Sequence, residues 1–214
     1  MGFMEKMVRQ CRKPTGWMAK FVGMGMNIGH SRVRRWGLNH VAVEPDASIL
    51  DVGCGGGRAV HVLAQMAPGG QVYGIDYSQD MVQLTQKVNR ALIEAGRVKV
   101  GHGSVSSLPF PDGMFDLVTA FEAYYFWPHL IDDLKEIKRV LRSGGTLLIA
   151  NEAYEHERFA KRNARWVQWG DMKIHAPDEY RAFLNEAGYA VVEIDVFPEK
   201  NWIAAVARKQ QDSN

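Results

Sequence analysis

The chain has 214 residues, of which 26 are basic and 24 acidic, so its net charge is +2 and its length suits one sizeable core rather than two domains. No apolar run approaches the ~20 residues of a membrane span, and the N-terminal stretch lacks the apolar core of a signal peptide. The two cysteines stand in unrelated contexts, which argues against a disulfide framework and leads us to expect a protein of the reducing cytoplasm.

The first 44 residues precede the first predicted core strand. Two helices are expected here, one capped by Thr15 and the other by Ser31. Basic side chains concentrate in the same stretch, where they could touch a nucleic acid or an acidic lipid surface, but such charge is more often a solvated face. We therefore expect no membrane partner and disfavour a nucleic-acid partner.

The stretch at 49–57 reads Ile-Leu-Asp-Val-Gly-Cys-Gly-Gly-Gly. Its apolar start predicts a short buried strand, and four glycines in five positions then end that strand in a bare, sharp turn. Apolar residues at helical spacing from Arg58 to Met66 predict a helix after the turn. Glycines let a ligand approach the main chain closely, and the helix N-terminus offers unpaired N–H groups to an anion.

The glycine spacing separates two cofactor classes. A dinucleotide fingerprint, Gly-x-Gly-x-x-Gly, needs a third glycine where this chain has Arg58 or Val60, which weakens a hydride-transfer function. The stretch instead resembles the first motif of class I S-adenosylmethionine-dependent methyltransferases, in particular their type 11-like small-molecule members. The motif is an apolar strand, Asp, an apolar residue and Gly-x-Gly-x-Gly, and its fixed positions are filled by Asp51, Gly53, Gly55 and Gly57.

This resemblance implies S-adenosylmethionine as the cofactor, with its amino-acid tail held at the loop by Asp51, Gly53, Cys54, Gly55 and Gly57. In this family extra N-terminal helices often fold over the open edge of the cleft. The resemblance therefore also implies a helical cap at residues 1–44 over a cofactor-binding domain at 45–214. Within that cap, the candidates for facing the reaction are Met24, Asn27 and His30. Alternatively, the methionines pad the sheet and the histidine is a surface or helix-capping residue.

A second strand is predicted at Val72 to Ile75, and an acidic residue follows at its tip. A carboxylate about 20 residues beyond a glycine loop is where a ribose diol is held by two hydrogen bonds, so Asp76 is the candidate for that role. Asp76 could instead merely cap the next helix, but Ser78 is the better placed cap. The resemblance supports the ribose role, and Tyr77 could lie along the adenine.

The third predicted strand, Val98 to Val100, leads into a loop with a departure from the family pattern. The family usually has Asp at the position of Ser104, where it accepts a hydrogen bond from the adenine amino group. A serine hydroxyl can also accept, and the backbone N–H of Val105 could serve the adenine ring. We therefore expect adenine binding to persist but to be weaker.

The fourth predicted strand, Phe115 to Phe121, runs into Glu-Ala followed by four consecutive aromatic residues, 124–127. Ligands of open α/β sheets bind outside the carboxyl ends of strands, so this run predicts the wall of the acceptor site, with Phe121 beside the cofactor. Aromatic ring faces also stabilise a cation such as a sulfonium. Since aromatic residues can equally belong to the core, we expect about half of the four to face the pocket.

The C-terminal part is predicted to hold a helix at 130–141, a Gly-Gly turn and an apolar strand at 146–150, a combination that resembles a further landmark of the family. Glu152 follows at that strand's tip, where either a proton-accepting or a buried structural role is open. Two more helices are predicted at 155–169 and 177–187, and two antiparallel strands at 189–196 and 202–207. The sequence contains no zinc-ligand spacing, so no metal is expected.

Together these elements predict a Rossmann-like α/β fold: a seven-stranded, mostly parallel sheet with helices on both faces, an antiparallel C-terminal hairpin and a helical N-terminal cap. The predicted reaction is in-line transfer of the sulfonium methyl group to a small-molecule acceptor by a monomer or homodimer. If the acceptor must lose a proton, the candidate groups are His30, Tyr124 and Glu152. Two alternatives stay open: a methyltransferase of RNA or protein, and a non-catalytic binding protein or oxidoreductase on the same fold.

Overall fold

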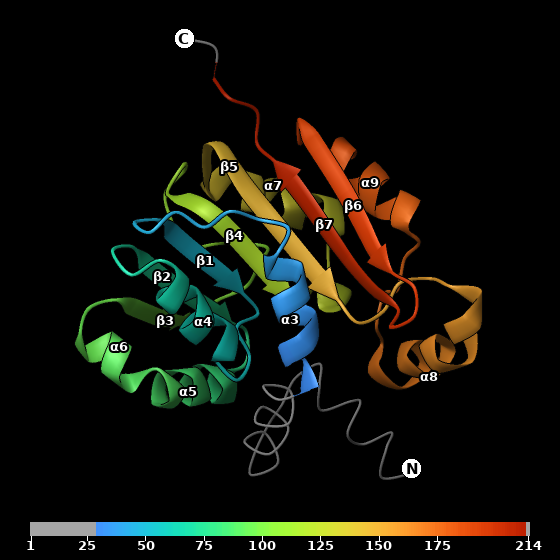
Figure 1. Cartoon of the computed structure of the whole chain (residues 1–214), viewed down its shortest axis with the longest axis horizontal. Coiled ribbons are helices and arrows are strands. Elements are labelled where there is room, and N and C mark those ends of the chain that lie inside the picture. The colour runs from blue at the N-terminus through green and yellow to red at the C-terminus, as the bar shows by residue number, and fades with distance from the viewer. Residues whose placement is uncertain (1–28, 213–214) are drawn as a thin grey trace.

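The computed structural model describes residues 29–212, and in this range the chain forms one seven-stranded sheet with helices on both faces (Figure 1). The strand order is β3-β2-β1-β4-β5-β7-β6, with β1 to β5 parallel and β7 antiparallel to both β5 and β6. This arrangement confirms the predicted sheet with its antiparallel C-terminal hairpin. The strands span Ser48–Val52 (β1), Gln71–Asp76 (β2), Val98–His102 (β3), Phe115–Phe121 (β4), Leu141–Asn151 (β5), Val191–Phe197 (β6) and Trp202–Arg208 (β7).

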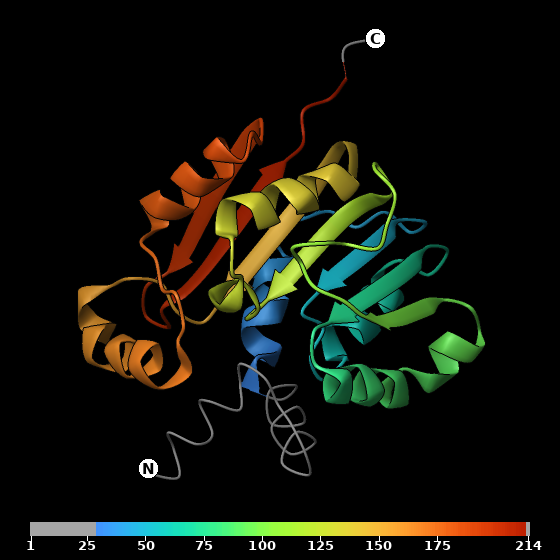
Figure 2. The ribbon, with the colours of Figure 1, turned by 180° about the vertical axis from the view of Figure 1, so that it is seen from behind.

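Helices cover the two faces of the sheet. α3 and α4 lie over the face that is in front in Figure 1, and α7 and α9 lie over the face that is in front in Figure 2. α8 lies at one corner of the molecule, beyond the end of β5. The helices span Ser31–Leu38 (α3), Arg58–Met66 (α4), Gln79–Val88 (α5), Arg90–Glu94 (α6), Leu130–Val140 (α7), Ala160–Gly170 (α8) and Pro177–Glu186 (α9), with single 3-10 turns at Tyr124–Phe126 (η1) and Glu157–Phe159 (η2).

Each face of the sheet has its own hydrophobic core. Successive residues of a strand point to opposite faces, so Ile49 of β1 joins the core under α3 and α4, while Leu50 joins the core under α7 and α9. Both side chains are fully buried. The central strands are therefore apolar on both sides, as is usual for a parallel sheet.

The junction between α7 and β5 differs from the prediction. Residues 142–145 were expected to form a Gly-Gly turn before a strand at 146, but β5 begins at Leu141, directly after the helix. The pairing of β5 with β4 shifts register between Phe115 and Leu117, so the extra residues are absorbed in a bulge. The helix predicted at 155–169 likewise begins later, at Ala160, after the turn η2.

α3 is the described part of the predicted N-terminal cap. It begins at Ser31, with His30 in the capping position rather than Ser31. The helix packs tightly on the sheet, since a Cβ atom placed on Gly37 would lie 2.5 Å from the Cβ of Ala150 in β5. The helix predicted after Thr15, together with Met24 and Asn27, lies outside the described residues. Among residues 29–212, no helix has the length and apolar character needed to cross a membrane.

Candidate functional site

The glycine loop after β1 is fixed to the neighbouring strand. The backbone N–H groups of Gly53 and Cys54 both donate to the carbonyl oxygen of Ile75 in β2, at 2.9 and 3.0 Å. Gly53 has a φ of 75°, and a Cβ atom there would lie 2.6 Å from the Cβ of Ala123. Gly57, with a φ of 81°, occupies the capping position of α4. The close packing and the left-handed conformation explain why this loop uses glycine.

A cleft of about 280 Å³ opens beside this loop. The strand order explains the position of the cleft, because β2 and β4 lie on opposite sides of β1 in the sheet. Ligands of doubly wound sheets bind at such a switch point, outside the carboxyl ends of the strands. Seven of the residues that the sequence predicts to contact the cofactor line the cleft together: Gly53, Gly55, Asp76, Tyr77, Ser104, Val105 and Phe121.

Asp76 lines the cleft and also holds the backbone on both sides of it. Its carboxylate accepts the N–H of Gly55 at 2.9 Å and the N–H of Ser78, the capping residue of α5, at 2.8 Å. It thus ties the glycine loop to the start of the next helix while it also lines the cleft. Burial raises the pKa of this carboxyl above its ordinary value. Tyr77 beside it is 38% exposed.

Three predicted cofactor residues lie behind the loop instead of lining the cleft. Asp51 is 1% exposed and accepts a hydrogen bond from the hydroxyl of Thr119 at 2.7 Å, and burial raises its pKa to about 7. The thiol of Cys54 points to Thr85, with 3.7 Å between sulfur and hydroxyl oxygen, and burial raises its pKa. Gly57 packs against the same threonine. These residues shape the loop from its inner side.

The four consecutive aromatic residues divide between cleft and core. Phe126 and Trp127 line the cleft, whereas Tyr124 and Tyr125 are buried. The Tyr124 ring stacks on Tyr180, with 4.7 Å between ring centroids, and burial raises its pKa far above the ordinary value. Tyr124 is therefore a neutral phenol behind the cleft wall, and its placement does not favour the proton-accepting role.

His30 and Glu152 meet at Glu122, which lines the cleft. Potential ligand atoms of the three side chains all lie within 4.8 Å of one another. Burial and the neighbouring Arg34 lower the pKa of His30 to about 4, so the imidazole is neutral. Burial raises the pKa of both carboxyls, and in Glu122 the charge of Glu152 raises it further.

Glu122 is a residue of the cleft for which the sequence pattern predicts no role. This residue follows β4 directly, lines the cleft and has a φ of 57°, which is uncommon for a residue with a side chain. Its carboxylate accepts a hydrogen bond from the backbone N–H of Glu152. Its position at the carboxyl end of a central strand is the one sequence feature that could have indicated a role in the site. The four aromatic residues after it were assigned to the site instead.

Known proteins resemble this chain over most of its length. A family described as a methyltransferase domain matches residues 50–149. A demethylmenaquinone methyltransferase of Geobacillus kaustophilus is 28% identical over 200 residues, covering 83% of this chain and 84% of the relative. A chain from the complex between the Haloferax volcanii Trm112 methyltransferase activator and a methyltransferase is 26% identical, with a TM-score of 0.80 over 91% of this chain and 96% of that one. A SAM-dependent methyltransferase from Aquifex aeolicus, at 18% identity, shares the fold with a TM-score of 0.71, covering 97% of this chain and 99% of that one.

Proposed function

Since this chain belongs to the class I S-adenosylmethionine-dependent methyltransferase superfamily, with S-adenosylmethionine as its cofactor, we propose that it methylates a small aromatic acceptor of the quinol type. The observation that carries the proposal is the cleft, which is lined both by the glycine loop with Asp76 and by the aromatic residues Phe126 and Trp127. The similarity to demethylmenaquinone methyltransferases supports a quinol acceptor in particular.

The cofactor end of the cleft suits S-adenosylmethionine. Gly53 and Gly55 line the cleft as bare main chain, which lets the amino-acid tail of the cofactor approach the backbone closely. The Asp76 carboxylate is the group proposed to accept hydrogen bonds from the ribose hydroxyls. Tyr77 would lie along the adenine, and Ser104 with the backbone N–H of Val105 would meet its polar edge.

The bound cofactor supplies an electrophilic methyl group on a sulfonium centre. The protein's main contribution is then to hold the acceptor atom in line with that methyl group, at roughly 3 Å, and to exclude water. Phe126 and Trp127 offer apolar ring faces to an aromatic acceptor and to the positive charge of the sulfonium. If the acceptor hydroxyl loses its proton, His30 and Glu152 are the proposed proton acceptors.

The proposal is tested by cofactor binding and by product formation. Calorimetry should show that D76N weakens S-adenosylmethionine binding at least ~10-fold, because a charged hydrogen-bond acceptor is worth roughly 1.5–3 kcal/mol. D132N is the matched control, since the Asp132 side chain is 80% exposed on α7. Incubation of the wild-type protein with methyl-labelled cofactor and a reduced demethylated naphthoquinone should label the quinol. Label that enters only RNA or protein, or no acceptor at all, would overturn the quinol proposal.

A further inference from the structure

Three potential metal ligands from separate parts of the chain meet beside the cleft, at Glu122 in its wall. His30 precedes α3, Glu122 follows β4 and Glu152 follows β5. One ligand atom from each lies within 4.8 Å of the other two. Glu122 also lines the cleft. The three groups therefore surround a point that an acceptor molecule could reach.

The fold holds the three ligands on rigid elements. β4 and β5 are parallel neighbours in which Phe121 pairs with Ala150, so the residues just beyond their ends lie side by side. Two further bonds fix this corner: the N–H of Glu122 donates to the carbonyl oxygen of Ala150 at 3.2 Å, and the N–H of Glu152 donates to the Glu122 carboxylate. On the third side, α3 packs directly on β5 through Gly37.

The two carboxylates have no direct counter-charge among the described residues. No ion pair within 4.0 Å joins either of them to a described cation. The charge of Arg162 acts on both carboxyls, but its guanidinium donates to the carbonyl oxygen of Glu152 and the side-chain oxygen of Asn163, each at 3.1 Å. It also lies over the rings of Phe159 and Trp166. Two like charges held this close are unfavourable unless a cation or a proton compensates them.

His30 adds a neutral donor to this pair. The imidazole is half-buried and offers one ring nitrogen to the point where the two carboxylates meet. One imidazole nitrogen with two carboxylates is a donor set that suits Mn²⁺, Fe²⁺ or Zn²⁺, whereas Mg²⁺ prefers oxygen ligands alone. Three protein ligands also leave coordination positions open.

We propose that His30, Glu122 and Glu152 bind a first-row divalent metal ion whose open coordination positions face the cleft and take oxygen atoms of the methyl acceptor. Sequence spacing predicts no such site, because its ligands come from three distant segments. The site goes beyond the proposed function, and it deepens that function by favouring acceptors with a hydroxyl or keto oxygen beside the methylated atom. Where the metal binds, His30 and Glu152 act as its ligands instead of as proton acceptors. Metal binding itself does not depend on the identity of the acceptor.

Metal binding is measured on the full-length protein with S-adenosylhomocysteine present, so that no reaction occurs. Titration with Mn²⁺, followed by the loss of the free-ion signal in electron paramagnetic resonance, should show one site per chain, and Zn²⁺ should displace Mn²⁺ as the stronger binder. H30A, E122Q and E152Q should each weaken binding at least ~10-fold. H129A is the control, since His129 is an exposed histidine at the start of α7 and should bind metal as the wild type does.

A second measurement guards against variants that fail to fold. In the wild-type protein, pulsed paramagnetic resonance of bound Mn²⁺ should show coupling to an imidazole nitrogen, and H30A should lose it. Absence of saturable binding up to about 1 mM Mn²⁺, which corresponds to a free energy of only about −4 kcal/mol, would overturn the inference. Binding that is equal in all three variants would also overturn it. Product formation without metal binding would contradict the metal site but not the proposed acceptor. Metal binding without quinol methylation would contradict the proposed acceptor but not the metal site.

Discussion

Gly53 is a position in the glycine loop that leaves no room for a side chain. Its φ of 75° disfavours any side chain, and a Cβ atom would lie 2.6 Å from the Cβ of Ala123. G53A should therefore shift the loop and weaken S-adenosylmethionine binding at least ~10-fold by calorimetry. Gly96 is the control, because its φ of 71° is similar but nothing lies within 4 Å of the added Cβ. G96A should lower stability by about 1 kcal/mol and leave binding unchanged.

Equal binding by G53A and the wild type would contradict this account of the loop. It would mean that the backbone between β1 and α4 can move without loss of the cofactor contacts. Weaker binding by G96A as well would point to global instability rather than to a local effect. Urea unfolding of both variants separates these two outcomes.

Asp51 should make stability depend on pH. Its pKa in the folded protein is about 7, whereas an unfolded aspartate titrates near ~3.9, so the unfolded state loses its proton first as the pH rises. The free energy of unfolding should therefore fall across this window, by roughly 2–3 kcal/mol between about pH 5 and pH 8. D51N cannot ionise and should escape this loss. Urea titrations of the two proteins at both pH values measure the difference, and a difference that stays constant with pH would contradict the prediction.

At the scale of elements, α3 depends on one close contact with the sheet. A Cβ atom on Gly37 would lie 2.5 Å from the Cβ of Ala150, so G37A should push the helix away from β5 and cost about 1–3 kcal/mol in the free energy of unfolding. Helix propensity alone predicts the opposite sign, a gain of about 1 kcal/mol. Chemical denaturation distinguishes the two. G101A in β3, where nothing lies within 4 Å of the added Cβ, should change stability far less.

The bounds of an element are predicted correctly where glycine positions and the apolar pattern are compatible with one secondary structure only. α4 begins at Arg58 and ends at Met66 as predicted, because the glycines before it and the apolar spacing within it agree. β5 was predicted to begin at 146 because Gly144 and Gly145 read as a turn. The structure uses them in a bulge within a longer strand, and only the pairing with β4 determines that choice.

In the site, too, features set by neighbouring residues in the chain were predicted, whereas features set by contacts between distant segments were not. Asp76 and the glycine loop could be located from the sequence because strand, loop and helix follow one another along the chain. The sequence could not tell that Tyr124 turns into the core while Phe126 faces the cleft, since both stand in one aromatic run. Glu122 was missed because its neighbours His30 and Glu152 stand just before α3 and just after β5. Residue spacing along the chain does not show that these three groups lie close together.

At the scale of the whole molecule, the cofactor should stabilise the fold by binding only the native state. The residues that line the proposed cofactor cleft come from the ends of β1, β2 and β4 and from the loop after β3, so no single segment retains the cleft when the sheet unfolds. S-adenosylmethionine or S-adenosylhomocysteine at about 100 times its dissociation constant should add about 2.7 kcal/mol and raise Tm by several degrees. NAD should leave Tm unchanged in the same thermal-shift plate. A shift with NAD alone would contradict the cofactor assignment.

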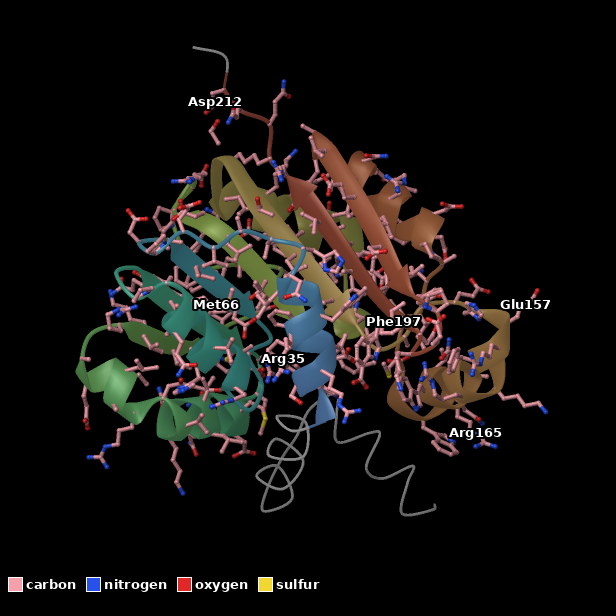
Figure 3. All side chains as sticks on the ribbon, in the orientation of Figure 1. Arg35, Met66, Glu157, Arg165, Phe197 and Asp212 are labelled. Atoms are coloured by element: carbon pink, nitrogen blue, oxygen red, sulfur yellow. The ribbon has the colours of Figure 1, made fainter. Side chains whose placement is uncertain are left out.

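The antiparallel direction of β7 has a practical consequence for these measurements. At its start β7 pairs near Asn151, close to the cleft, and at its end Arg208 pairs with Thr146 at the far side of the sheet. Asp212 accordingly lies at the end of the molecule opposite to α8 (Figure 3). A biotin or affinity handle attached beyond β7 would tether the protein to a sensor chip with the cleft facing the flowing solution. Immobilisation in this way need not obstruct ligand binding.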